Sequence, residues 1–124
     1  SCGGFTGGVM VMSSVFGRRR DKWENDQVDK DCAHNMARAL LNKFNEKYGS
    51  HICRIIHHRL FDREFDLKDA KEREMFERLG AHDDKCTSVV GTAAAWATEL
   101  ILEELAIRKM SLNDIRKMQV SGRS

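Results

Sequence analysis

Four cysteines, Cys2, Cys32, Cys53 and Cys86, offer the most reactive side chains in this chain of 124 residues. No two of them form a CxxC pair, so the zinc-ribbon, thioredoxin and c-type haem attachment motifs are absent. We expect Cys53 and Cys86 in the first turns of two helices, where backbone N–H groups and the helix dipole stabilise a thiolate. Thiolates in such positions react, form disulfides or bind soft metals, so these two cysteines are the candidate catalytic residues.

A structural role is the competing interpretation, because cysteine is also a small apolar residue of protein cores. Cys32 lies on the apolar stripe of its predicted helix, and we interpret it as a core residue. For Cys53 and Cys86 the spacing leaves core and site equally open. His57 follows Cys53 by four residues and shares its helix face, so it is a candidate metal ligand, with an ordinary surface histidine as the alternative.

Several function classes lack support in the sequence. The HExxH, GxSxG and phosphate-loop motifs are absent, so the sequence offers no catalytic motif of a hydrolase or a kinase. Glu103 and Glu104 are interpreted as solvated helix surface.

The charge does not indicate a nucleic-acid partner. Net charge is +2, and the basic cluster 18–20 is followed at once by Asp21, so we expect no nucleic-acid partner. No apolar run reaches about 18 residues, so no membrane span is expected. No export signal is visible, which favours the cytoplasm.

The elements that must position these cysteines are predicted to be helices. Proline is absent, so long helices can run without interruption. We expect an all-α fold, a compact bundle of about five helices, in one domain over residues 1–124, which is either the whole protein or the C-terminal part of a longer one. Asn25 and Ser50 are predicted N-caps. The expected helices span 9–16 (with a strand as the rival), 25–48, 51–61, 67–79, a long helix from Asp83 or Asp84 to about 105, and a short helix after Ser111.

Glycines and other small residues mark two segments. The first eight residues contain four glycines, which allow close backbone approach or form a flexible end. Small residues from Gly91 to Ala97 would let another helix approach closely. Together with Trp23 and Trp96, this face suits either a partner helix or a homodimer, although burial in the core is the favoured interpretation of each tryptophan. The alternative function is therefore a helical interaction or assembly module whose cysteines are structural.

The order of the cysteines and their flanking residues resembles the C-GCAxxG-C-C family of redox-active proteins. Cys2 opens a glycine-rich segment like the family's helix start. Phe44 and the run 48–53, Tyr-Gly-Ser-His-Ile-Cys, match the family's aromatic-Gly-Ser element before its next cysteine. Cys86 begins an alanine-rich C-terminal helix. The resemblance covers about residues 2 to 105, although Gly4 stands where the family usually has alanine.

The resemblance implies an all-helical domain in which Cys2, Cys53 and Cys86 form a redox-active or metal centre, with an iron–sulfur cluster as one form of it. It also implies a redox protein as a partner. The family's N-terminal cysteine segment has no match in this chain. A cluster needs four ligands, so Cys32, a histidine such as His57, or a partner chain would have to complete the set.

Overall fold

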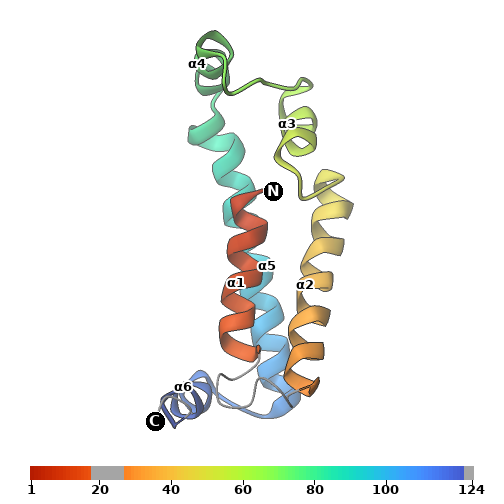
Figure 1. Ribbon diagram of the computed structural model, residues 1–124, viewed down its shortest axis with the longest axis vertical. Coiled ribbons are helices and arrows are strands. Elements are labelled where there is room, and N and C mark those ends of the chain that lie inside the picture. Colours follow the sequence, from red (N-terminus) through yellow and green to blue (C-terminus); the bar gives the residue numbers. More distant parts are fainter. Residues whose placement is uncertain (18–26, 122–124) are drawn as a thin grey trace.

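The computed structural model describes residues 1–17 and 27–121 and is built of helices (Figure 1). The predicted all-α fold is confirmed. Three long helices lie side by side, and shorter helices occupy the two ends of this bundle (Figure 1). In chain order the elements are α1 (Gly3–Phe16), α2 (Gln27–Tyr48), α3 (Cys53–Phe61), α4 (Ala70–Arg78), the π-helix η1 (Ala81–Lys85), α5 (Cys86–Arg108) and α6 (Leu112–Ser121).

The three long helices are held together by stripes of buried residues that recur about every four positions. Such spacing places side chains on one face of a helix, where they can pack against a neighbour. α1 packs most extensively against α5 and α2. Val28 continues the four-residue spacing of α2 yet is exposed, so the stripe ends before it. The buried residues are Gly4, Gly8, Met12 and Phe16 in α1, Met36, Leu40, Phe44 and Tyr48 in α2, and Val89, Ala93, Ala97 and Leu105 in α5.

The glycine-rich start of the chain is helical, which corrects the prediction that the first helix begins at Val9. A Cβ on Gly4 would lie 3.2 Å from Ala93 Cβ, and a Cβ on Gly8 would lie 2.8 Å from Leu40 Cδ2. These two glycines therefore let α1 lie against the other long helices at close range. Tertiary packing outweighs the low helix propensity of glycine here.

The shorter helices begin later than expected, for identifiable reasons. The Ser50 hydroxyl accepts the Ile52 N–H at 3.0 Å, so it caps a turn, and α3 begins only at Cys53. α4 begins after Asp69, whose carboxylate accepts the Lys71 N–H at 3.0 Å. Gly49 and Gly80 adopt φ values of 81° and 93°, which suit glycine at the ends of helices.

The predicted start of the last long helix at Asp83 or Asp84 is wrong. Both residues lie within η1, which follows Gly80 and continues directly into α5 (Figure 1). Cys86 consequently has a helical turn in front of it. The Cys86 N–H donates to the Ala81 carbonyl, a π-type bond, so this amide is already occupied.

Two of the remaining predictions concern residues that the structure describes, Ser111 and Trp96, and the others do not. Ser111 caps the last helix, since its hydroxyl accepts the Asp114 N–H at 3.3 Å. Trp96 is half-buried against Phe44 and Tyr48, at ring-centroid distances of 5.6 and 6.1 Å. Asn25, Trp23 and the basic cluster 18–20 lie outside the described residues.

One shallow groove of about 260 Å³ runs between α1 and α5. Its walls are the exposed sides of Gly3, Gly7, Val11, Val90 and Ala94. A Cβ on Gly3 or Gly7 would meet nothing within 4 Å. The expected small-residue face therefore exists, while the homodimer stays a prediction. Among the described residues, no helix has the length and apolar character needed to cross a membrane.

Candidate thiol site

Cys2 is the residue immediately before α1 and is nearly buried, with 9% of its surface exposed. Its N–H donates to the His51 carbonyl at 2.8 Å, which ties the start of α1 to the turn before α3. Its Sγ lies 3.6 Å from the point where a Cβ on Gly4 would stand. That separation is an ordinary van der Waals contact, so the tighter approaches at Gly4 are those to Ala93 Cβ at 3.2 Å and Val90 Cα at 3.3 Å in α5.

Cys53 is the first residue of α3 and is half-buried, so its predicted place at a helix start is confirmed. Ile52 occupies the N-cap position and its side chain makes no capping hydrogen bond. The start of α3 beside Cys53 therefore has no side-chain cap.

Cys86 lies where η1 passes into α5, and its surroundings oppose ionisation. Burial raises the pKa of this thiol, and the nearby charges of Cys2, Cys53 and Glu77 raise that pKa further. The expectation that a free helix start would stabilise its thiolate is wrong, because η1 occupies that position. The hydrogen bond from the Cys2 N–H to the His51 carbonyl places the start of α1 beside the turn that precedes Cys53, at the end of the bundle that carries α3. All four cysteines are free thiols.

His57 is the nearest polar neighbour of Cys86, with Nε2 3.8 Å from Sγ. The ring is buried, with 8% of the residue exposed, and it packs on Phe76 at 4.7 Å and edge-on to Phe61 at 6.2 Å. This burial lowers the pKa of His57, so the imidazole is neutral at neutral pH. A neutral imidazole nitrogen beside a thiol can accept the thiol proton.

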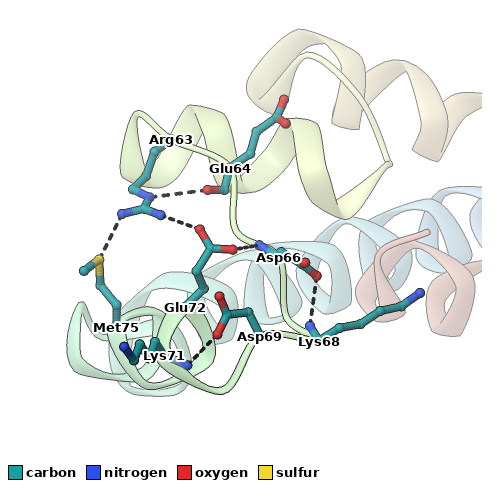
Figure 2. A network of polar contacts seen from close by, with 8 residues as sticks. All are labelled: Arg63, Glu64, Asp66, Lys68, Asp69, Lys71, Glu72 and Met75. Carbon is teal, nitrogen blue, oxygen red and sulfur yellow. Dashed lines mark hydrogen bonds and ion pairs between the residues drawn. The ribbon is translucent and has the colours of Figure 1, made fainter.

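A polar network on the α3–α4 connection holds α4 in place (Figure 2). The Arg63 guanidinium donates to Glu72 Oε1 at 3.0 Å and to Met75 Sδ at 2.9 Å, while Glu72 Oε2 accepts the Asp66 N–H at 2.7 Å. The network joins the end of α3 to α4, from which Phe76 reaches the His57 ring. The polar connection and the aromatic contact together keep His57 out of water.

The predicted metal-ligand set of Cys2, Cys53, Cys86 and His57 does not fit a metal ion as arranged. Across residues 1–17 and 27–121, no three His, Cys, Asp or Glu side chains are placed to hold one. The residues present therefore do not fit an iron–sulfur cluster either, since a cluster needs four converging ligands. The arrangement does suit thiol chemistry, because it combines several free cysteines with a neutral base.

Cys32 lies at the opposite end of the bundle, where it packs against the core as predicted and also has polar partners that the sequence did not indicate. Its Sγ accepts from Arg108 Nη2 at 3.3 Å and contacts Glu104 Oε1 at 3.7 Å. Glu104 is only 24% exposed and pairs with Arg108 at 2.9 Å, so its interpretation as solvated surface was wrong. The i,i+4 spacing of these two charges is the signal in the sequence that points to this pair.

Comparison with known proteins gives one family. The family model described as "Putative redox-active protein (C_GCAxxG_C_C)" matches residues 1–100, which include all four cysteines. No curated protein and no solved structure matches the chain.

Proposed function

Since the chain belongs to the C_GCAxxG_C_C family of redox-active proteins, we propose that it exchanges thiols and disulfides through Cys53 and Cys86. The observation that carries this proposal is the contact of the free Cys86 thiol with the buried imidazole of His57, and the charges of Cys2 and Cys53 also act electrostatically on this thiol. Cys2 is the third thiol of this site.

Cys53 is the attacking thiol in this proposal. A thiolate is the reactive species in exchange, and the raised pKa of Cys86 makes that thiol the poorer attacker, so we assign the attack to Cys53 at the start of α3. The Cys53 sulfur attacks one sulfur of a partner's disulfide. An S–S bond forms between Cys53 and the partner, and the partner's second sulfur leaves as a thiolate and takes a proton.

Cys86 is the resolving thiol. Its raised pKa keeps it protonated until the mixed disulfide has formed, and His57 Nε2 then accepts its proton. The Cys86 sulfur attacks Cys53, which releases the partner as a dithiol and leaves a Cys53–Cys86 disulfide. The partner disulfide gains two electrons, and the two thiols of this chain lose them.

The test is a trapping experiment with oxidised glutathione as the disulfide, followed by mass spectrometry of the intact chain and its peptides. We expect the unmodified chain to lose two hydrogens by joining Cys53 to Cys86. Cys86→Ser is expected to accumulate a glutathione adduct on Cys53. Cys53→Ser is expected to react slowly, because the raised pKa of Cys86 leaves it a poor attacker.

A Cys2→Ser variant tests whether the third cysteine of the site is needed for the reaction. It is expected to form the same Cys53–Cys86 disulfide as the unmodified chain. An adduct on Cys86 in place of Cys53, or a disulfide that needs Cys2, would overturn the assignment of roles. Stoichiometric iron or zinc in anaerobically purified protein would favour the metal centre that the family resemblance implies.

An interaction module is the second candidate, and the apolar groove between α1 and α5 is the observation that favours it. α1 carries no charged residue from Gly3 to Phe16, although Met10 and Val11 on it are 71% and 53% exposed. A helix that is apolar on all sides is usually covered. Four thiols that all react slowly with oxidised glutathione would favour this candidate over the redox protein.

A further inference from the structure

The outer side of α1 carries glycines that the packing of a single chain does not require. Gly4 and Gly8 face the other long helices, where a Cβ would crowd α5 or α2. Gly3 and Gly7 lie beside the groove between α1 and α5, and a Cβ on either would meet nothing within 4 Å. Glycine is the least favourable helix residue after proline, so these two glycines weaken α1 without serving the chain's own packing. A backbone that approaches closely from outside the chain would account for them.

The surface around these glycines carries no charge. α1 has no charged residue from Gly3 to Phe16, and α5 has none from Cys86 to Thr98, although 32% of the chain's residues are charged. Val11 in α1 and Val90 in α5 are each about half exposed, and both line the groove. A charged partner surface would lose its hydration here without finding a counter-charge, so the partner surface has to be uncharged as well.

One stripe of α1 offers both a recess and a projection. Gly3, Gly7 and Val11 follow one another at intervals of four residues, which places them on one face of the helix. The glycines leave the groove open, whereas the Val11 side chain is 53% exposed one turn further along. A two-fold axis across α1 near the level of Gly8 would place Val11 of each copy over the glycines of the other. The face is thus self-complementary, as an interface between identical copies requires.

We propose that two copies of this chain pair through this groove, with the α1 helices antiparallel and α5 of each copy beside them. Antiparallel helices bring opposite dipole ends together and keep the Cys2 ends of the two copies apart. α1 has 14 residues, so with its neighbour α5 it presents a face of roughly 20 by 20 Å. That is less than the roughly 800 Å² that each partner of a standard complex buries, so we expect a dimer that dissociates at micromolar concentrations.

The dimer does not depend on thiol–disulfide exchange, because no cysteine lines the groove. A second copy of the chain is the partner that the groove fits, so this dimer is the assembly that the interaction module considered above would form.

Sedimentation velocity of the reduced, full-length chain over a wide range of concentrations tests the proposal. A reducing agent excludes disulfide-linked pairs, and we expect the sedimentation coefficient to rise from that of a monomer to that of a dimer. Ala94→Lys should weaken the dimer by about a hundredfold or more, because two-fold symmetry places two unpaired ammonium groups in each interface. Ala95→Lys is the matched control, since Ala95 is an exposed alanine of the same helix that does not line the groove.

Gly7→Leu is a second test, because it fills the groove and raises helix propensity. It should also weaken the dimer, and circular dichroism should show that the variant keeps its helices. Below the dissociation constant this substitution acts on the single chain alone, where a Cβ on Gly7 meets nothing within 4 Å. A chain that stays monomeric at every concentration would overturn the proposal, as would a dimer that Ala94→Lys and Ala95→Lys weaken equally.

The reaction of the same variants with oxidised glutathione separates the two proposals. A monomer that still joins Cys53 to Cys86 would refute only the dimer. A dimer with four unreactive thiols would refute only the exchange.

Discussion

The two ends of the helical bundle surround a cysteine in contrasting ways. At the α3 end, Cys86 has a neutral, buried imidazole as its neighbour, and aromatic rings exclude water from it. At the other end, Cys32 lies against a cation that is tied to a carboxylate. A neutral base can only take the thiol proton, whereas a fixed cation stabilises the thiolate itself. The Cys86 thiol therefore has a proton acceptor beside it. The Cys32 thiol instead lies between a cation and a carboxylate, and burial and Glu104 raise its pKa in spite of Arg108.

Phe76→Ala should give the largest effect, a loss of stability at the α3–α4 end of the bundle and not at the other end. Phe76 is 4% exposed and contacts the rings of His57, Phe61 and Phe65. Truncating a buried phenylalanine costs about 3–5 kcal/mol. Because Phe76 lies outside the main core cluster, we expect this loss as opening of the α3–α4 end.

Hydrogen exchange measured by mass spectrometry tests that expectation. Amides of α3 and α4 should lose protection in Phe76→Ala, while those in the middle of α1 and α2 keep theirs. Leu79→Ala is the control, since Leu79 lies three residues after Phe76 at the end of α4 but is 46% exposed. Equal loss of protection across all the helices would mean that the α3–α4 end is an integral part of the bundle.

The helices and caps that depend on the spacing of neighbouring residues were predicted correctly. The four-residue stripes of α2 and α5 identify their helices, because each stripe needs only residues of its own segment to be recognised. The place of Cys53 in the first turn of its helix and the cap at Ser111 also depend on neighbours within three residues. The family resemblance drew on the same local elements, such as the run that ends in Cys53.

The features that were missed depend on residues far apart in the chain. Gly4 and Gly8 are helical because Ala93 and Leu40 pack against them, and no local signal states this. The π-helix before Cys86 removes the helix start that the spacing predicted, and no pattern in the segment marks it. The neighbours of Cys32 come from a helix more than 70 positions away. Tertiary contacts determine these features, so spacing alone could not supply them.

Gly8→Leu should weaken both ends together, since α1 runs from Cys2 to the Phe16 ring beneath Arg108. A Cβ on Gly8 would lie 2.8 Å from Cδ2 of the fully buried Leu40, so one of the two side chains would have to shift. Overpacking of this kind costs about 1–3 kcal/mol. Urea unfolding should show this loss, and the reaction rates of Cys86 and Cys32 should both change.

Gly7→Leu is the matched control, because a Cβ on Gly7 meets nothing within 4 Å. Both substitutions gain about 1 kcal/mol in helix propensity, so the difference between them isolates the packing. Equal stabilities of the two variants would show that α1 does not need its close approach to α2.

The smallest effect that we expect is a pH dependence confined to the α3 end. Burial lowers the pKa of His57 below its ordinary value of 6.5, so the folded protein binds the proton less readily than the unfolded chain does. The contribution of His57 to stability is therefore complete above pH 6.5. It decreases as the pH falls below that value and levels off below the pKa of the folded state.

Urea unfolding of the unmodified chain between pH 7.5 and pH 5 measures this slope, with His57→Gln and His58→Gln as a pair. His58 is exposed, so its substitution should leave the slope unchanged, whereas His57→Gln should make the profile flatter. Protonated His57 also cannot accept the Cys86 proton, so alkylation of Cys86 should slow over the same pH range. The alkylation rate of Cys32 should instead depend only on ionisation of the Cys32 thiol. Identical slopes for the two histidine variants would mean that the aromatic cover does not keep His57 neutral. Cys86 would then lie beside a cation, as Cys32 does, and the contrast between the two ends would disappear.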